Sequence, residues 1–397
     1  MKKIEVRGLT KVFGRNPRLG VKLLNQGKTK KEILEKTGMT VGVNNASFEV
    51  NTGEIFVIMG LSGSGKSTLI RLINRLIEPS AGDVFIDGEN LSKMNRNQLR
   101  EIRRKKLGMV FQKFGLFPHR TILENAGYGL EVQGVDKEEI KEKAFEALKM
   151  VGLEGYESQY PDQLSGGMQQ RVGLARALAN DPDVLLMDEA FSALDPLIRK
   201  EMQDELIVLQ SKMKKTILFI THDLDEALKL GDRIALMKDG IIVQIGTPEE
   251  IMTNPANEYV EKFVEDVDRS KVFSAQQVMI KPETIEAERH GPRVALQRMK
   301  KAGISSIYVV DKNQNLLGII TAEAASKAAQ EGQKDVYAVL DKDVPIVGPD
   351  LPLNEVFDLI YDSPIPVAVV RDNKLIGIII RSTVIAALAR NGVKNDE

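Results

Sequence analysis

One short motif constrains the fold of this chain more than any other. Residues 60–67 read GLSGSGKS and fit the pattern G-x-x-x-x-G-K-[ST]. They follow an apolar run, EIFVIM (54–59), that predicts a buried strand, and they open a helical pattern, KSTLIRLINRLI (66–77). A strand, a glycine-rich loop and a helix in this order let backbone N–H groups face phosphate oxygens. The motif therefore predicts an α/β domain that binds a phosphorylated ligand.

The chemistry of this loop assigns roles to its residues. Lys66 is predicted to reach the β- and γ-phosphates of a nucleotide, and Ser67 is predicted to ligate Mg²⁺. The other predicted phosphate contacts are Gly60, Ser62, Gly63, Ser64, Gly65 and Thr68. The alternative, a glycine- and serine-rich turn without a ligand, is disfavoured by the strand before the loop and the helix after it.

Residues 1–265 alternate apolar runs with helical patterns. VLLMDE (184–189) and KTILFITHD (215–223) predict two more buried strands, so we expect a largely parallel central sheet. Residues from about 15 to 40 interrupt this pattern. There, Thr29 and Glu32 form a capping-box pattern before a stop at Gly38, which predicts one short inserted helix. Two interpretations of this insertion are equally open: a solvent-exposed decoration without a functional role, and a functional contact.

The second predicted strand ends in two adjacent carboxylates. Side chains alternate along a strand, so Asp188 and Glu189 need not share one role. Asp188 suits a Mg²⁺ ligand, and Glu189 suits the polarisation of an attacking water. Taken alone this pair is a weak signal, because many strands end in acidic residues.

A second phosphate cradle is predicted at LSGGMQQR (164–171). Ser165, Gly166 and Gly167 would lie at the N-terminus of a helix, where N–H groups and the helix dipole attract anions. One ATP does not need two such cradles on one domain. The economical solution is a head-to-tail homodimer, in which this segment covers the ATP held by Lys66 of the other copy.

Composition narrows the function classes further. Lys and Arg total 55 and Asp and Glu total 56, a formal net charge of -1 that argues against a nucleic-acid partner. The chain has no cysteine, which excludes disulfides and thiolate metal sites. We find no signal-peptide pattern and no run of about 18 apolar residues. Other subunits would therefore have to cross a membrane if the protein acts at one.

With these motifs in order, about the first 250 residues resemble the nucleotide-binding domain of an ABC transporter, a P-loop NTPase with a helical subdomain. The matching positions, in chain order, are the phosphate loop at 60–67, Gln112, the signature at 164–168, the acidic strand at 184–189, the loop SALD at 192–195 and His222. The signature has Met168 where glutamine is usual, and we expect no loss of activity from this difference.

The resemblance implies further roles. Phe13 would stack on adenine, with a core phenylalanine as the alternative. Gln112 would contact Mg²⁺ and the attacking water, and His222 would contact the γ-phosphate as a switch. Asp195 would act across the dimer interface. Residues 117–130 would lie in the helical lobe that receives the coupling helix of a permease.

Residues after about 265 have a different character, and the predicted polar helix 257–270 marks the boundary. Segments 303–329 and 362–389 repeat each other, with Gly318 equivalent to Gly377, which gives a repeat of roughly 60 residues. The repeats resemble a tandem pair of CBS modules of α+β fold, at about 272–332 and 335–392.

Three features together resemble the ATPase subunit of bacterial glycine betaine/proline betaine uptake systems: the insertion, Ala190 after the acidic strand, and the CBS pair. This resemblance implies ATP hydrolysis with Mg²⁺, a homodimer, two transmembrane permease subunits and an extracytoplasmic binding protein or fused binding domain. It places the chain at the cytoplasmic face of the membrane, in contact with it through the permease.

Other functions are weighed against this one. Choline, carnitine or an amino acid is an alternative solute, because the ATPase would be identical. A soluble ABC ATPase of translation or DNA repair is disfavoured, since such proteins usually carry two ATPase domains or a long coiled coil. A degenerate ATPase that only senses nucleotides is disfavoured by the presence of Glu189 and His222.

The CBS pair is expected to regulate, and the family implies ionic strength and, in some members, cyclic di-AMP as signals. Thr321, Ile380 and Arg381 lie at predicted strand ends where such a ligand would bind. The positions where CBS modules often carry a ribose-binding aspartate hold Ala324 and Thr383, which argues against AMP or ATP as the signal. A purely structural dimerisation module is the alternative.

Overall fold

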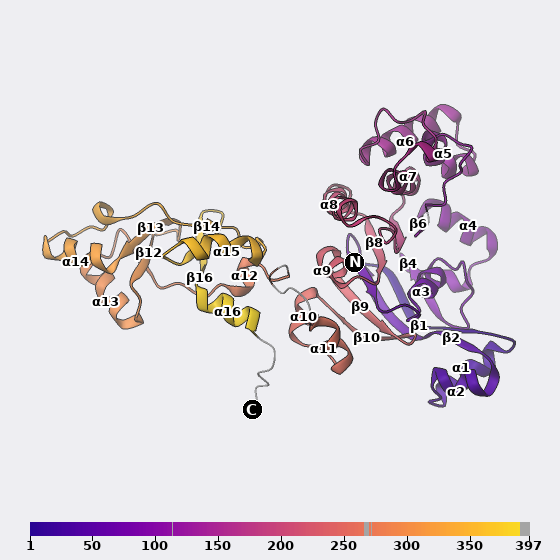
Figure 1. The fold of residues 1–397 in the computed structure, drawn as a ribbon, viewed down its shortest axis with the longest axis horizontal. Helices are drawn as coiled ribbons and strands as arrows, with labels where there is room; N and C mark the ends of the chain where they lie inside the picture. The colour runs from indigo at the N-terminus through magenta and orange to yellow at the C-terminus, as the bar shows by residue number, and fades with distance from the viewer. Residues whose placement is uncertain (113, 266–269, 271, 390–397) are drawn as a thin grey trace. The chain divides into compact units, whose positions relative to one another are not determined.

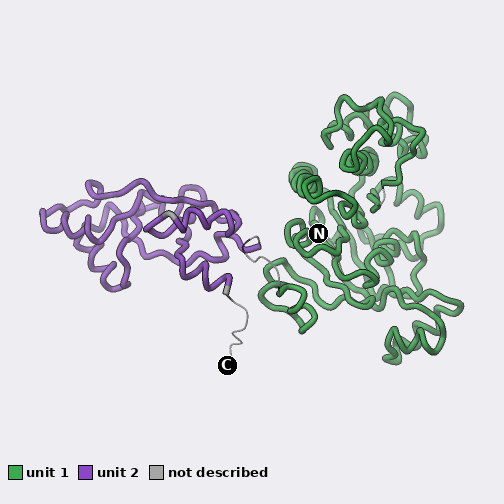
Figure 2. Tube along the Cα trace, in the orientation of Figure 1, with its two compact units in different colours: residues 1–267 green, residues 268–397 purple. Residues whose placement is uncertain are grey.

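The protein is described by a computed structural model that covers residues 1–112, 114–265, 270 and 272–389 (Figure 1). Its contacts divide the chain into two compact units, Met1–Val267 and Asp268–Glu397 (Figure 2). The polar helix predicted over 257–270 is present as α11 (Glu258–Val264), and residues 266–269 lie outside the described residues. None of the helices in the described part of the chain combines the length and apolar character needed to cross a bilayer.

The first unit is built on a six-stranded sheet of order β10-β9-β3-β8-β7-β6. Its strands are β3 (Ile55–Met59), β6 (Leu107–Val110), β7 (Val184–Asp188), β8 (Thr216–Thr221), β9 (Arg233–Lys238) and β10 (Ile241–Gly246). All neighbours are parallel except β9 and β10, so the predicted largely parallel sheet is confirmed. Every residue of β3, β7 and β8 is buried, as expected for parallel strands covered on both faces.

A second, antiparallel sheet of order β2-β1-β4-β5 completes this unit. It contains β1 (Lys2–Phe13), β2 (Thr40–Asn51), β4 (Ala81–Ile86) and β5 (Glu89–Asn90). Buried apolar side chains of both sheets share one core, which includes Ile4, Val50, Phe56, Ile58, Val84 and Ile220. This common core fixes the end of β1 relative to the phosphate loop.

The insertion between β1 and β2 contains two helices, α1 (Pro17–Asn25) and α2 (Lys30–Thr37), where the sequence predicted one. The capping box of Thr29 and Glu32 begins α2, and Gly38 ends it in the left-handed conformation, as predicted. Helix α1 was missed because Gly20 lies in its middle. A Cβ at Gly20 would lie 2.6 Å from Val12 Cγ1, so packing against β1 requires glycine despite its poor helix propensity.

Helices cover the six-stranded sheet and form a separate lobe. The helices next to the sheets are α3 (Lys66–Ile73), α4 (Arg96–Lys105), α8 (Pro196–Met213), α9 (Leu224–Leu230), α10 (Pro248–Thr253) and the short η1 (Leu91–Lys93). The lobe packs α5 (Ile122–Gln133), α6 (Lys137–Met150) and α7 (Gly166–Leu178) together (Figure 1). The short η2 (Pro161–Gln163) is tied to α7 by a hydrogen bond from Gln169 Nε2 to the Pro161 carbonyl oxygen. Helix α3 ends before the predicted residue 77, because Arg75 turns left-handed (φ 54°).

The second unit contains two three-stranded sheets of the same design. The first consists of β11 (Thr284–Glu286), β12 (Ser306–Val310) and β13 (Leu316–Thr321), and the second of β14 (Ile346–Val347), β15 (Val367–Arg371) and β16 (Lys374–Ile379). Each has one parallel and one antiparallel pairing. Gly318 pairs with Val309 and Gly377 pairs with Val369, so the predicted equivalence of the two glycines holds in the strand register.

The hydrophobic core of each repeat includes side chains from outside that repeat. The helices are α12 (Ala275–Val278), α13 (Pro292–Ala302), α14 (Ala322–Gln330), η4 (Tyr337–Val339), α15 (Leu353–Asp362) and α16 (Arg381–Ala389). Phe273 and Val278, which precede the first sheet, pack in the core of the second repeat. Val336, which follows the first repeat, packs in the core of the first. The module limits expected from the sequence therefore do not coincide with the limits of the two hydrophobic cores. Residues 390–392 of the second expected module lie outside the described residues.

Candidate nucleotide and metal site

The phosphate loop joins β3 to α3 through three glycines with positive φ, Gly60 (154°), Gly63 (77°) and Gly65 (105°). A Cβ on Gly60 would lie 2.2 Å from the Met237 carbonyl oxygen, and one on Gly65 would lie 2.3 Å from the Gly42 carbonyl oxygen. Both contacts are with backbone, which cannot yield as a flexible side chain can. Glycine is therefore required at 60 and 65 by space as well as by conformation.

Lys66, the first residue of α3, curls back over this loop. Its Nζ donates to the carbonyl oxygens of Gly60 at 2.8 Å and Leu61 at 3.2 Å, and it lies 3.8 Å from Glu189 Oε1. Burial lowers the pKa of Lys66, and the carboxylates of Glu189 and Asp188 oppose that shift. An anionic phosphate beside this ammonium would supply the negative charge that favours its protonated form.

Ser67 and Asp188 form the candidate metal site. Ser67 Oγ donates to Asp188 Oδ1 at 2.9 Å. Two adjacent oxygens of an octahedral Mg²⁺ with bonds of about 2.0–2.1 Å are separated by √2 times that length, about 2.9 Å. The separation of the two oxygens is therefore compatible with both of them binding one Mg²⁺, once the Ser67 hydroxyl turns its proton away from Asp188. Among the described residues, no group of three or more acidic or histidine side chains could hold a metal.

Glu189, His222 and Gln112 meet at the carboxyl ends of three neighbouring strands. Glu189 follows β7 in the left-handed conformation (φ 46°), and its N–H donates to the Ile220 carbonyl oxygen at 3.0 Å. Its Oε2 lies 3.3 Å from His222 Nδ1 and accepts a hydrogen bond of 3.2 Å from Gln112 Nε2. The structure thus brings together the predicted base, switch and glutamine, although 110 residues separate Gln112 from His222 in the chain.

A cavity of about 310 Å³ opens beside the loop. It is lined by Phe13, Lys30, Thr40, Val41, Gly42, Ser62, Gly63, Gly65, Lys66, Ser67, Thr68 and Glu189. Phe13 is 39% exposed, which suits a stacking surface better than a core position. Ser64 is buried behind the loop, where its carbonyl accepts from the Gly240 N–H at 2.8 Å.

Sequence reasoning missed several residues of this cavity. Lys30, Thr40, Val41 and Gly42 flank the insertion or belong to it, and they carry no motif. They reach the cavity because β2 runs beside β1, where Phe13 pairs with Thr40. The signal that could have located them is the position of the insertion directly after Phe13.

The second phosphate cradle lies elsewhere in the unit. Ser165 caps α7 by accepting from the Met168 N–H at 3.3 Å, and Asp195 caps α8 by accepting from the Ile198 N–H at 3.1 Å. A Cβ on Gly167 would lie 2.5 Å from Ile198 Cγ2, so α7 and α8 meet at this glycine. Gly166 is exposed beside it. Of the described residues that line the nucleotide cavity, none comes from 164–168, so one chain does not bring its two cradles together.

A larger cavity of about 740 Å³ reaches the metal site from the helical lobe. Its lining includes Gln112 and Asp188 together with Arg71, Phe111, Gly115, Phe117, Tyr128 and Arg176. The rings of Phe117 and Tyr128 pack with centroids 4.5 Å apart. Burial lowers the pKa of Arg176, whose guanidinium donates to the carbonyl oxygens of Gly115 (2.6 Å) and Phe114 (2.9 Å). Phe117 and Tyr128, from the region expected to receive a coupling helix, thus line the same cavity as the candidate metal ligands Gln112 and Asp188.

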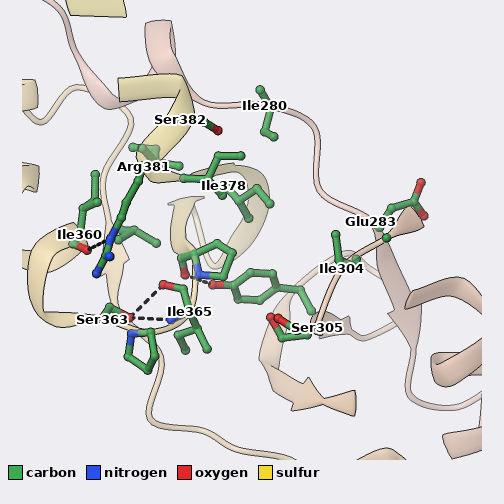
Figure 3. A pocket seen from close by; sticks show the side chains of 18 residues that line it. Ile280, Glu283, Ile304, Ser305, Ile360, Ser363, Ile365, Ile378, Arg381 and Ser382 are labelled. Carbon is green, nitrogen blue, oxygen red and sulfur yellow. Dashed lines mark hydrogen bonds between the residues drawn. The ribbon is translucent and has the colours of Figure 1, made fainter. Parts of the chain in front are cut away.

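The second unit contains a cavity of about 530 Å³ between its two repeats (Figure 3). Ile380 and Arg381 line it, as the sequence predicted, whereas Thr321 does not. The Thr321 hydroxyl instead caps α14, accepting from the Ala324 N–H at 3.2 Å. The Arg381 guanidinium donates to the carbonyl oxygens of Ile360 (3.2 Å) and Tyr361 (2.9 Å), so it also holds the end of α15.

Comparison with known proteins agrees with this geometry. The family model described as ABC transporter matches residues 43–192, and the CBS domain model matches 275–331 and 334–390. The glycine betaine/carnitine transport ATP-binding protein of Listeria monocytogenes is 62% identical over 99% of both chains. The glycine betaine transport ATP-binding protein of Bacillus subtilis is 64% identical over 98% of this chain and 93% of that protein.

More distant similarity extends to an enteric relative and to solved structures. The glycine betaine/proline betaine transport ATP-binding protein of Escherichia coli is 50% identical over 99% of both chains. A dimeric ATP-binding cassette in a post-hydrolysis state with ADP and Pi aligns with a TM-score of 0.53 and 34% identity. That alignment covers 62% of this chain and 98% of the cassette.

Proposed function

Because this chain belongs to the family of ATP-binding subunits of ABC transporters, we propose that it powers the uptake of glycine betaine or a related quaternary-amine osmoprotectant. The proposal is carried by one combination of findings. Glu189, His222 and Gln112 form a cluster suited to ATP hydrolysis, and the similar proteins are named for glycine betaine transport. Carnitine and choline are alternative solutes, since the names of relatives of this chain include them.

Each group of residues in the site has its own role in ATP hydrolysis. The loop N–H groups and Lys66 would bind the phosphates, and Ser67 and Asp188 would hold Mg²⁺. Gln112 lines the same cavity as Asp188 and would contact the same ion. Bound Mg²⁺ neutralises charge on the phosphate oxygens. Glu189 orients the attacking water and accepts its proton. His222 and Gln112, at 3.3 and 3.2 Å from the Glu189 carboxylate, fix its direction.

We propose a head-to-tail homodimer as the active form. Ser165, Gly166 and Gly167 lie outside the nucleotide cavity of their own chain, and Asp195 is exposed next to them. A second copy would cover the cavity with these groups. The solved relative that resembles this unit is itself dimeric and bound to ADP and Pi, which supports the proposal.

The remaining partners follow from family membership. Two permease subunits would dock coupling helices at the cavity near Phe117 and Tyr128, which would place the chain at the cytoplasmic face of the membrane. An extracytoplasmic binding protein, or a binding domain fused to the permease, would deliver the solute.

The second unit is proposed to regulate this ATPase. Its 530 Å³ cavity falls within the range of small-molecule sites, and the serine hydroxyls and Arg381 in its lining suit an anionic ligand such as cyclic di-AMP. Glu283 in the same lining would oppose such a ligand. Ionic strength is the second candidate signal, because screening lengths fall from about 10 Å at 0.1 M to about 3 Å at 1 M salt.

The test is ATP-driven uptake of labelled glycine betaine in liposomes that contain the chain and its permease, at low and high internal salt. Uptake that rises with salt and competes with carnitine or choline would support the substrate class and the regulation. ATP hydrolysis without glycine betaine uptake would redirect the assignment to another solute. A chain that assembles but does not hydrolyse ATP would contradict the proposal itself.

A further inference from the structure

Lys30 lines the nucleotide cavity although it belongs to the insertion rather than to any nucleotide-binding motif. It is the first residue of α2 and is half-buried. The same cavity is lined by Phe13, Lys66 and Thr68. The insertion is therefore part of the cavity wall, which favours a functional contact over a solvated decoration.

The lysines that neighbour Lys30 have partners in the chain. Lys28 lies 3.1 Å from Glu32 Oε1, and Lys31 lies 4.0 Å from Glu35 Oε1. The Glu32 carboxylate also accepts from the Thr29 N–H at 2.8 Å, and these contacts lower the pKa of Glu32 to about 2. Within the part of the chain that the structure describes, Lys30 forms no hydrogen bond or ion pair. Its charge is thus available to a ligand.

The position of Lys30 in α2 is electrostatically unfavourable without an anion nearby. The first turn of a helix carries the positive end of the helix dipole, where acidic residues are favoured and cations are not. The charged groups that line the cavity are Lys30, Lys66 and Glu189, which sum to one positive charge. A cavity of this charge suits the phosphates of a nucleotide more than its neutral base.

We propose that the Lys30 ammonium binds the phosphate groups of the nucleotide, so that the insertion contributes a second lysine to the ATP site. A lysine ammonium is a compact, strongly hydrated point charge, which gains more from a phosphate than from a base or a ribose. The inference rests on the proposed binding of ATP at the phosphate loop and adds a residue to it.

The test compares nucleotide binding by the full chain and its variants. Lys30→Ala is expected to weaken binding of Mg²⁺ with a non-hydrolysable ATP analogue by about three- to tenfold at low salt. Lys30→Arg should restore most of the affinity. The matched control is Lys36→Ala, an exposed lysine in the last turn of the same helix that does not line the cavity.

Two further readouts separate a phosphate contact from a structural effect. The loss in Lys30→Ala should shrink between 0.05 and 0.5 M salt, because screening weakens a contact between charges. Adenosine, measured by competition at millimolar concentration, should bind the variant and the parent equally. In hydrolysis assays the KM for ATP should rise while kcat stays nearly constant, since Lys66, Glu189 and His222 are unchanged.

The outcomes distinguish this inference from the function on which it rests. Unchanged affinity in Lys30→Ala, with a parent chain that binds the analogue, would overturn the inference alone. An equal loss for adenosine and for the analogue would also overturn it, because the contact would then not be to phosphate. A parent chain that fails to bind the analogue would overturn the proposed function as well.

Discussion

Ser67 Oγ and Asp188 Oδ1 lie 2.9 Å apart and join the first turn of α3 to the end of β7 across 121 residues of sequence. This separation equals that of neighbouring ligands on one Mg²⁺, about 2.9 Å. The pair couples the phosphate loop to the acidic strand before any ligand arrives. Asp188 is nevertheless costly to bury, being only 5% exposed.

Asp188→Asn is expected to stabilise the nucleotide-free protein while it impairs hydrolysis. Burial raises the pKa of Asp188, so its carboxyl binds a proton more readily in the folded chain than in the unfolded one. Such a group contributes stability below its unfolded pKa and loses that contribution as pH rises through its folded pKa. At pH 7.5 the variant should gain roughly 1 kcal/mol in the free energy of unfolding.

Unfolding measured from pH 4 to 8 without nucleotide would check this, with Asp225→Asn, an exposed residue of α9, as the control. The gain should shrink as pH falls toward 4. Mg²⁺-dependent ATP hydrolysis should fall by about 100-fold or more. A variant that is less stable at pH 7.5 would show that the Asp188 carboxylate contributes more to the fold than its burial costs.

Glu189→Gln is expected to bind ATP and nearly abolish its turnover, so that ATP-bound dimers accumulate. The amide retains the size of the side chain but cannot accept a proton from water. Phosphate release and size-exclusion chromatography with ATP would measure the two effects. Glu201→Gln, on the exposed face of α8, is the control. Fast hydrolysis by Glu189→Gln would remove Glu189 from the role of base.

Gly318→Ala is expected to unfold the second unit selectively. Gly318 has a φ of 154°, and its Cβ would lie 2.2 Å from the Asp341 carbonyl oxygen. The backbone at position 318 and the backbone at Asp341 must move apart to admit the Cβ. The free energy of unfolding of this unit should therefore fall by about 2–4 kcal/mol. Gly348→Ala is the control, since a Cβ at Gly348 would meet no neighbouring atom within 4 Å.

Thermal unfolding followed together with ATP hydrolysis would report on both units. The Gly318→Ala chain should show an earlier transition for the second unit and nearly unchanged hydrolysis. If ATP hydrolysis were lost at the same temperature as the folded state of the second unit, the ATPase unit would depend on the second unit for its own stability.

Deletion of residues 272–397 is expected to preserve ATP hydrolysis and to remove its regulation by salt in the assembled transporter. The core that unites both sheets of the first unit, with the partly buried side chains packed against it, contains no residue beyond Ile245, so the ATPase unit keeps that core. Uptake at low and high internal salt would be compared for the full and shortened chains. The same salt dependence in both would contradict a regulatory role for the second unit.

The sequence predicted most of the hydrolytic site because its motifs are local. The phosphate loop, Glu189 and His222 each follow a buried strand, and parallel strands place their carboxyl ends at one edge of a sheet. Lys30 could not be predicted in this way, because its place in the cavity depends on how α2 packs against β1 and β2. Helix α1 was not predicted, because Gly20 in its middle disfavours a helix. Glycine is required at position 20 because a Cβ there would clash with Val12 of β1.

The second unit shows the same division between local and long-range information. The repeat predicted the equivalence of Gly318 and Gly377, which the strand registers confirm. It did not predict the short parallel strands β11 and β14. It did not predict the role of Thr321 as the cap of α14, because a cap and a ligand site both favour a hydroxyl at a strand end.

The interleaved cores of the second unit restrict how its gene can change. A stop codon between the repeats would leave the first sheet intact, yet Phe273 and Val278 would lose the second-repeat core in which they are buried. Removal of the first repeat would likewise leave the second without that apolar cover. Loss of either repeat would therefore expose apolar surface that the other repeat covers, so we expect a stable second unit to need both repeats.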